Sequence, residues 1–285
     1  MEFLQLVVYG IVLGSIITLG AIGVSMIFGI LRFAHFAHGD LMTLGAYFAF
    51  VCVVTFGLPM IVAFALAIVG GAAAAVLLDQ TLYRRLRRSP PVILLISSFG
   101  VALILRSLVQ LIWGPSTQVY ESGIQMPVLV AGLRIKPDHF WIVGGALALV
   151  VGLHLFLQRT TMGKAMRAMS DNVDLARITG IDTEKVVIWT WIIAGLMAAA
   201  AGVFLAMDTR LHPTMGWRFL LSVFAAAILG GIGRPYGAIA GGMVIGISEE
   251  VSTLFLNPSY KAAVSFAILV VMLIVRPTGL FGGRS

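Results

Sequence analysis

The sequence predicts an all-α membrane protein that crosses the bilayer about eight or nine times. Of its 285 residues, 60% are hydrophobic and only 11% are charged, and the mean hydropathy is +1.03. A soluble domain carries about 25% charged residues, too many to be compatible with this composition. Charge-free runs such as 3–31 and 41–78 are long enough to cross the hydrocarbon core as helices. Outer-membrane strands would instead alternate polar and apolar residues.

The first apolar run is expected to remain as a transmembrane helix. It has no positively charged start, because the first arginine is Arg32, and it is longer than the apolar core of a signal peptide. The single cysteine, Cys52, lies within a span and forms no intrachain disulfide. We therefore expect residues 1–285 to form one transmembrane domain.

The remaining spans follow from the apolar runs and the turn residues between them. Gly57-Leu58-Pro59 separates the second span from the third. The predicted spans are 5–30, 39–56, 59–79, 92–113, 139–158, 185–207, 217–232, 236–255 and 261–276. The segments 217–232 and 261–276 are short, and either one could be tilted or re-entrant, which leaves a count of eight open.

The distribution of Lys and Arg predicts the orientation in the membrane. These residues gather in the segments 84–88 and 159–185 and, as Arg276 and Arg284, at the C-terminus. Lys and Arg near the ends of spans favour the cytoplasmic side. With nine spans, the N-terminus then lies outside and the C-terminus inside. The net charge of +7 therefore reflects topology and does not predict nucleic-acid binding.

Glycine is frequent and regularly spaced. Gly233, Gly237 and Gly241 recur every four residues, a spacing that predicts close packing between membrane helices. The stretches 19–23 (LGAIG) and 229–233 (LGGIG) resemble each other. Interrupted spans in corresponding halves of a chain are typical of an internal repeat with a central site, so these stretches are candidates for such interruptions.

The long basic segment 159–185 is too polar to lie in the membrane. Asp171 or Asn172 can cap a helix, and Gly180 can end it, so we predict a two-turn helix near 172–179 with a short turn at 164–169 before it. So short a helix is marginal in water. It must pack either on the protein's own transmembrane helices or on a cytosolic partner.

Four motifs then occur in order: FAHFAHGDLMTLGAY (33–47), GKAMRAMSDNVDLARITGID (163–182), AAAILGGIGRPYGAIAGG (225–242) and RPTGLFGGR (276–284). Over nearly its whole length the chain resembles the branched-chain amino acid ABC transporter permeases, specifically the shorter, first type of the two permeases that these systems pair. It departs from the family at His35, where Asn is expected, and at Arg234, where a small residue is common.

The resemblance implies the permease subunit of an ATP-binding cassette importer in the prokaryotic plasma (inner) membrane. The solute would be small and polar, a branched-chain or other amino acid. The implied partners are a second homologous permease, two cytosolic ATPase subunits and an extracytoplasmic solute-binding protein. The chain has no G-x-x-x-x-G-K-[ST] loop. We therefore expect it to bind no cofactor and to catalyse no reaction, with ATP and Mg on the ATPase subunits.

The resemblance also implies site residues. The residues expected to contact the ATPase are Gly163, Lys164, Arg167, Asn172, Ala176, Arg177 and Gly180. The candidates for the translocation pathway are His38, Gly39, Asp40, Gly230, Gly231 and Gly233. A stand-alone secondary carrier or channel for a small solute is the alternative function, and it would need no ATPase.

Several polar residues leave alternatives open. His35, His38 and Asp40 could bind a metal, but their place at a membrane end favours a helix break and cap. Arg106 lies within a span, either as a functional group or with its side chain extended outward to the interface. Glu249 and Glu250 are either interfacial or part of the pathway. The chain has no H-E-x-x-H or G-x-S-x-G motif that would predict an enzyme.

Overall fold

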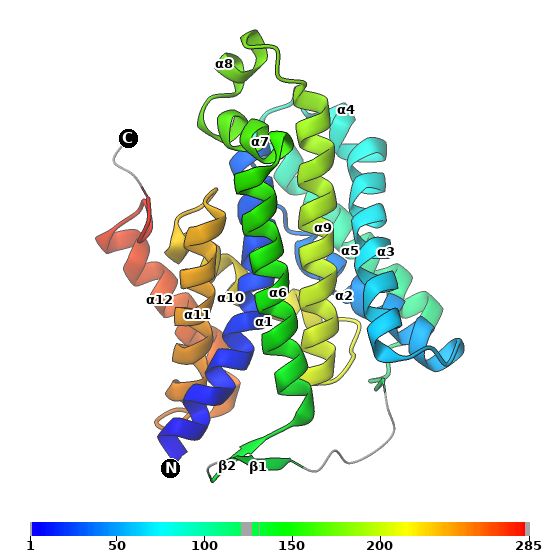
Figure 1. Cartoon of the computed structure of the whole chain (residues 1–285), viewed down its shortest axis with the longest axis vertical. Helices are drawn as coiled ribbons and strands as arrows, with labels where there is room; N and C mark the ends of the chain where they lie inside the picture. Colours follow the sequence, from blue (N-terminus) through cyan, green and yellow to red (C-terminus); the bar gives the residue numbers. More distant parts are fainter. Residues whose placement is uncertain (1, 121–126, 131, 283–285) are drawn as a thin grey trace.

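The computed structural model describes residues 2–120, 127–130 and 132–282 (Figure 1). The long helices are α1 (Glu2–Leu31), α2 (His38–Phe50), α3 (Met60–Leu78), α5 (Pro91–Trp113), α6 (Pro137–Arg159), α9 (Thr183–Asp208), α10 (Met215–Gly230), α11 (Pro235–Ser252) and α12 (Lys261–Val275). Within the described residues, seven helical segments are long and apolar enough to span a membrane, and α10 is a shorter apolar helix. The prediction of a polytopic helical membrane protein is confirmed.

Shorter elements extend or connect these helices. The π-helix η1 (Val51–Thr55) continues α2, and η2 (Asp79–Tyr83) joins α3 to α4 (Arg84–Leu86). Strands β1 (Val128–Val130) and β2 (Leu133–Ile135) form an antiparallel hairpin before α6. The remaining elements are α7 (Thr161–Asp171), α8 (Val173–Ile178) and the 3₁₀ turn η3 (Pro258–Tyr260).

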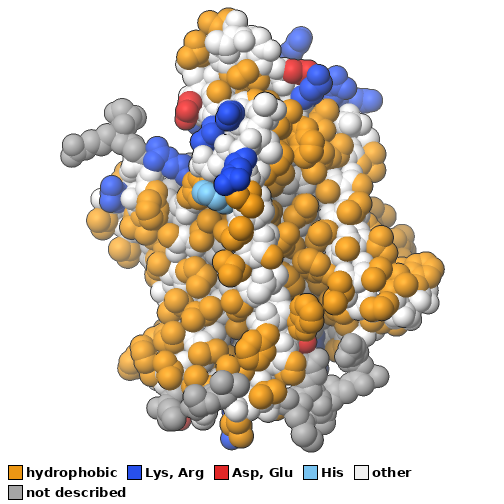
Figure 2. All heavy atoms as spheres, in the orientation of Figure 1, with side chains coloured by type: hydrophobic (Ala, Val, Ile, Leu, Met, Phe, Trp, Pro, Cys, Tyr) orange, Lys and Arg blue, Asp and Glu red, His pale blue; other side chains and the backbone are white. Residues whose placement is uncertain are grey.

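The two ends of the bundle differ in charge. Helices α4, α7 and α8 lie at one end, and the N-terminus and the β1–β2 hairpin lie at the other (Figure 1). Lys and Arg side chains gather at the first end, whereas the flanks of the molecule are mainly hydrophobic (Figure 2). This arrangement brings the two basic loops together on the side predicted to be cytoplasmic. Arg284 lies outside the described residues.

Helices α1 and α9 form the centre of the bundle and are buried over most of their length. Helices α3, α5, α6 and α12 surround them and expose apolar side chains, for which lipid serves as the solvent. Small residues permit the close contacts that the glycine pattern predicts. A Cβ on Gly10 of α1 would lie 2.7 Å from the Cα of Ile247 on α11.

The prediction that 19–23 and 229–233 mark interruptions of corresponding spans is wrong. Gly20 and Gly23 lie inside the uninterrupted helix α1, where they leave room for Val223 and His38. Gly231 and Gly233 instead adopt positive φ angles of 105° and 83° in the turn between α10 and α11. One glycine pattern therefore serves helix packing and the other serves a turn.

An inverted repeat does relate two other parts of the chain. A long central helix, an irregular segment and a shorter helix follow one another as α1, 32–37 and α2, and again as α9, 209–214 and α10. Helices α1 and α9 run in opposite directions (Figure 1). Their partners correspond as well, because α11 packs along α1 and α3 packs along α9. Both irregular segments lead into the interior of the bundle.

Candidate functional site

The first interruption places the start of α2 inside the bundle. Residues 32–37 are irregular, and Arg32 has a φ of 58°, in the left-handed region. The predicted helix break is confirmed. The predicted cap is not, because Ala37 occupies the N-cap position and no side chain caps α2. The carboxylate of Asp40, which could have capped the helix, pairs with Arg106 instead.

Asp40 and Arg106 form a bidentate ion pair between two of the membrane-spanning segments, α2 and α5. Arg106 donates from Nε to Asp40 Oδ1 and from Nη2 to Oδ2, each over 3.0 Å. The guanidinium also lies 4.6 Å from the ring centroid of Trp217 on α10. The side chain of Asp40 is 1% exposed and that of Arg106 is 16% exposed. The alternative in which Arg106 extends outward to the interface is therefore wrong.

The first turns of α2 and α10 meet beside this pair. A Cβ on Gly39 would lie 2.4 Å from the carbonyl oxygen of Gly216, so neither position has room for a side chain. The Gly216 N–H donates to Thr43 Oγ1 over 3.1 Å. Asp40 and Trp217 directly follow the two glycines in sequence. Arg106 of α5 thus contacts both interrupted regions at once.

Aromatic rings pack around the two histidines at the break. His35 Nε2 lies 3.0 Å from Tyr83 Oη, and Tyr83 stacks on Trp191 with ring centroids 5.1 Å apart. His38 fills the space beside Gly23, where an added Cβ would lie 2.5 Å from its Cε1 atom. Among the described residues, no group of three His, Cys, Asp or Glu side chains is arranged to hold a metal ion. The cluster instead fixes the path of the chain through the break.

The second group of pathway candidates lies elsewhere. Gly230 ends α10, and Gly231 and Gly233 form the turn that follows it. A Cβ on Gly230 would lie 2.0 Å from the Gly237 carbonyl oxygen. These glycines allow α10 and α11 to pack closely. Since Gly216 lies at the opposite end of α10, the structure does not bring them together with His38, Gly39 and Asp40.

Glu249 is buried between three helices. It accepts a hydrogen bond from Ser222 Oγ of α10 over 2.5 Å and another from Ser265 Oγ of α12. Glu250 pairs with Lys261 at the start of α12. The interfacial alternative is therefore wrong for Glu249, whose carboxylate joins α10, α11 and α12.

Helix α7, in the segment predicted to be cytoplasmic, folds back onto the bundle. Thr160 caps it by accepting from the Gly163 N–H over 2.9 Å. Gly163, Met166 and Met169 are buried, and a Cβ on Gly163 would lie 2.4 Å from the Phe156 carbonyl oxygen of α6. This regular apolar face produces a helix longer than the predicted turn at 164–169, because each turn gains a buried contact.

Helix α8 confirms the predicted helix near 172–179. Asn172 caps it by accepting from the Leu175 N–H over 2.9 Å, which decides between the two predicted capping residues. Gly180 follows the helix with a φ of 87°. The outward face is apolar in part, because Leu175 is 55% exposed and Ile178 is 80% exposed.

The residues predicted to contact an ATPase divide into two groups. The first group is exposed on the segment 159–185 and comprises Lys164, Arg167, Asn172, Arg177 and Gly180. Gly163 and Ala176 are buried against the protein itself, so they stabilise the segment and are not available for direct contact. Packing on the protein's own helices is therefore confirmed for α7, whereas α8 leaves a surface open and its binding to a cytosolic partner stays a prediction.

Two contacts connect the segment 159–185 to the long helices. Arg32 Nη2 donates to the Ser170 carbonyl oxygen over 2.6 Å, which joins the end of α7 to the break before α2. At the other end of the segment, Asp182 Oδ1 accepts from the Lys185 N–H over 3.1 Å and caps α9. This backbone hydrogen bond, with help from the Lys185 side chain, lowers the pKa of the Asp182 carboxyl.

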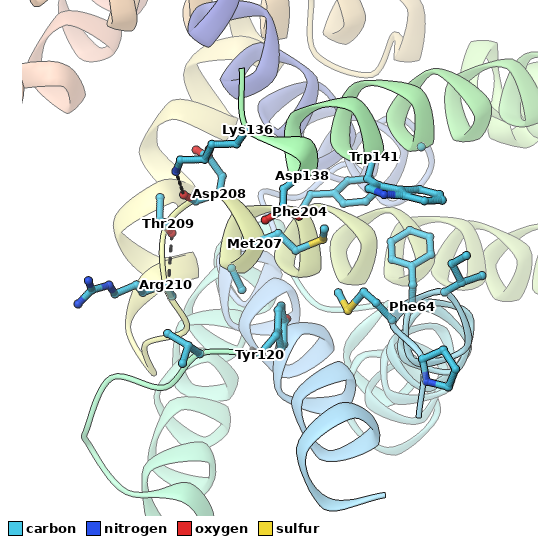
Figure 3. A pocket seen from close by; sticks show the side chains of 16 residues that line it. Phe64, Tyr120, Lys136, Asp138, Trp141, Phe204, Met207, Asp208, Thr209 and Arg210 are labelled. Atoms are coloured by element: carbon cyan, nitrogen blue, oxygen red, sulfur yellow. Dashed lines mark hydrogen bonds between the residues drawn. The ribbon is translucent and has the colours of Figure 1, made fainter. Parts of the chain in front are cut away.

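A cavity of about 690 Å³ lies at the opposite end, which is predicted to be extracytoplasmic (Figure 3). Helices α3, α6 and α9 and the segments before and after them form its walls. Its apolar side includes Phe64 stacked on Phe204, with ring centroids 4.9 Å apart. Its polar side includes Lys136, which donates to the Asp208 carbonyl oxygen over 3.3 Å. No sequence pattern predicts this cavity, because its residues come from the ends of several spans.

Comparisons with known proteins match almost the whole chain to one family of proteins. The family model described as "Branched-chain amino acid transport system / permease component" matches residues 6–273. The high-affinity branched-chain amino acid transport system permease protein LivH of Escherichia coli (strain K12) is 34% identical, over 98% of this chain and 96% of the relative. The corresponding protein BraD of Pseudomonas aeruginosa is 30% identical, over 99% and 96%.

Two more distant similarities were found, and one of these relatives is named for another solute. The ribose import permease protein RbsC of Escherichia coli (strain K12) is 26% identical over 49% of this chain and 44% of its own. A solved structure of PsaBC from Streptococcus pneumoniae in complex with Fab has a TM-score of 0.54 and 14% identity, and covers 99% of this chain and 94% of that one. The structural likeness shows a common fold.

Proposed function

The chain belongs to the family of permease components of branched-chain amino acid transport systems, and from this premise we propose that it forms half of the membrane pathway of an ABC importer. A second, homologous permease completes the pathway. The solute is a branched-chain or similar amino acid, which an extracytoplasmic binding protein delivers. The protein is a multi-pass component of the prokaryotic plasma (inner) membrane.

Two cytosolic ATPase subunits supply the energy in this proposal, and ATP and Mg bind to them. This chain contains no phosphate-binding loop of the G-x-x-x-x-G-K-[ST] type. Helix α8 is the main observation in support. It exposes Leu175 and Ile178 at the basic end of the bundle, together with Arg167 and Arg177 of the same cytoplasmic segment. Apolar anchors rimmed by charges are typical of a surface that binds another protein.

A series of contacts connects this segment to the interior of the bundle, and motion of the segment is transmitted through them. Helix α7 contacts the break at 32–37 through the hydrogen bond from Arg32 to Ser170. That break leads to His38 and to the first turn of α2, which contacts α10. When ATP draws the ATPase subunits together, the docked segment shifts and α2 moves with it. ATP favours one orientation only through its different affinity for the two states of the complex.

Reconstitution into proteoliposomes tests this function. The permease pair with its ATPase subunits is expected to take up radiolabelled leucine only with internal ATP and loaded binding protein. Arg167→Glu is expected to reduce ATPase binding. Arg85→Gln, which changes an exposed cation of α4 at the same end of the bundle, provides the control. Uptake by this chain alone, without ATP or partners, would instead establish a stand-alone carrier or channel.

A further inference from the structure

We propose that the Asp40–Arg106 pair receives the charged groups of a zwitterionic α-amino acid as it passes through the permease. This inference rests on the proposed function and names a site for its solute. The pair lies where α2, α5 and α10 meet. Charged side chains inside a membrane are costly, and they face the interior of a bundle or a water-filled cavity. A charge pair at this place therefore marks a polar route.

The guanidinium of Arg106 is only partly used by its neighbour. The two hydrogen bonds to Asp40 occupy Nε and Nη2, and within the described part of the chain Nη1 makes no hydrogen bond. The Arg106 side chain is 16% exposed, so this chain does not enclose it completely. A second permease or a water-filled route covers the exposed part, because hydrocarbon would leave the remaining N–H groups without acceptors.

Aromatic side chains form a surface beside the pair. Trp217 lies under the guanidinium, and Phe99 of α5 packs edge-on against Trp217 with ring centroids 5.6 Å apart. Phe99 is 42% exposed. An amino acid whose charged end is at Arg106 would find these rings within reach of its side chain. The surface thus combines a polar anchor with an apolar wall, as small-molecule sites do.

The chemistry of the pair selects the class of solute. An α-amino acid carries one carboxylate and one ammonium group on the same carbon. Arg106 offers hydrogen-bond donors to the carboxylate, and Asp40 offers acceptors to the ammonium group. A neutral sugar has neither charge and would not compensate for separating the pair. Between the two kinds of solute in the names of the relatives, the pair therefore favours an amino acid over ribose.

A second ion pair in the chain provides a matched control. Arg87 and Asp79 are paired at the cytoplasmic end, with side-chain exposures of 16% and 1%, the same as those of Arg106 and Asp40. Arg87 also pairs with Glu184 on α9. Breaking this pair removes an ion pair of equal burial at a place away from Trp217 and the meeting point of α2 and α10. It therefore measures the structural effect of losing a pair of this burial, together with the added loss of the contact to Glu184.

The test uses the whole complex in proteoliposomes, with a saturating amount of leucine-loaded binding protein. Arg106→Gln is expected to lower the maximal rate of leucine uptake at least tenfold, and Arg106→Lys to restore part of it. Arg87→Gln is expected to stay within threefold of the wild type per assembled complex. If wild-type uptake depends on ATP and Arg106→Gln matches it within twofold, the proposal is wrong while the proposed function stands.

A labelling experiment decides the matter if Arg106→Gln does not assemble. In a Cys52→Ser background, Leu103→Cys on the Arg106 side of α5 is expected to react with a membrane-impermeant thiol reagent. Leucine-loaded binding protein with ATP is expected to change that rate at least threefold. Val151→Cys on the exposed side of α6 is the lipid-facing control and is expected not to react. A Leu103→Cys that stays unreactive in every nucleotide state overturns the proposal.

Discussion

Gly39 and Gly216 lie so close that a Cβ on either residue would overlap the carbonyl oxygen of the other, at 2.4 Å from Gly39 and 1.8 Å from Gly216. The two residues are far apart in sequence, and each belongs to the first turn of a helix that begins inside the bundle. Their contact brings the two interrupted regions of the inverted repeat together. It also places Asp40 and Trp217 where both contact Arg106.

Gly39→Ala and Gly216→Ala are therefore expected to destabilise the protein by about 1–3 kcal/mol each, the usual effect of overpacking. Thermal unfolding of the purified protein in detergent measures the change. Gly100→Ala on α5 is the control, because among the described residues no neighbouring atom lies within 4 Å of the position that its Cβ would take. There the loss of a helical glycine is expected to be neutral or to stabilise by up to about 1 kcal/mol. Equal effects at the three positions would contradict the contact.

Two buried tyrosines differ in whether the hydroxyl group has a partner. Tyr83→Phe removes the group that bonds His35, so we expect a loss of about 1–2 kcal/mol in the free energy of unfolding. The hydroxyl of Tyr47 has no hydrogen-bond partner among the described residues. Tyr47→Phe is thus expected to be neutral or slightly stabilising. Unfolding midpoints of the two variants in the same detergent provide the comparison, and a larger loss for Tyr47→Phe would refute it.

Arg32 combines a left-handed backbone conformation with the hydrogen bond to Ser170, and one substitution tests both. Its left-handed conformation costs roughly 1–2 kcal/mol for a residue with a side chain, and glycine relieves that cost. Arg32→Gly therefore keeps the protein folded but removes the hydrogen bond to Ser170. We expect fewer leucine molecules transported per ATP hydrolysed, with unfolding unchanged within about 1 kcal/mol. The ratio of uptake to ATP hydrolysis in proteoliposomes measures this effect, and an unchanged ratio would exclude a role for this contact.

The exposed apolar face of α8 is expected to bind the ATPase. Ile178→Glu adds a charge at a residue that is 80% exposed, so the stability of this chain should change by less than about 0.5 kcal/mol. Binding of the purified ATPase subunits is expected to weaken at least tenfold, which equals about 1.4 kcal/mol. Light scattering or co-purification measures the assembly. Intact assembly and uptake in this variant would place the ATPase contact elsewhere.

The segment 159–185 shows which features could be predicted from local sequence. The helix at α8, its Asn172 cap and its Gly180 end could be predicted, because capping depends on residues within a few positions of each other. The length of α7 could not, since it depends on burial of Met166 and Met169 against other helices. The burial of Gly163 and Ala176 could not be predicted for the same reason. The resemblance implied that both residues contact a partner, but they are buried in this chain.

The sequence by itself determined the class of protein, its approximate spans and its family. It also predicted that the basic loops lie at one end of the bundle. These depend on composition, on the length of apolar runs and on contiguous motifs. Only the tertiary structure decided which helices meet. It separated the glycines of α1 from those after α10, and it paired Asp40 with an arginine 66 positions away. Such contacts arise from the packing of whole helices, and no local pattern records which residues of distant helices come within hydrogen-bond distance.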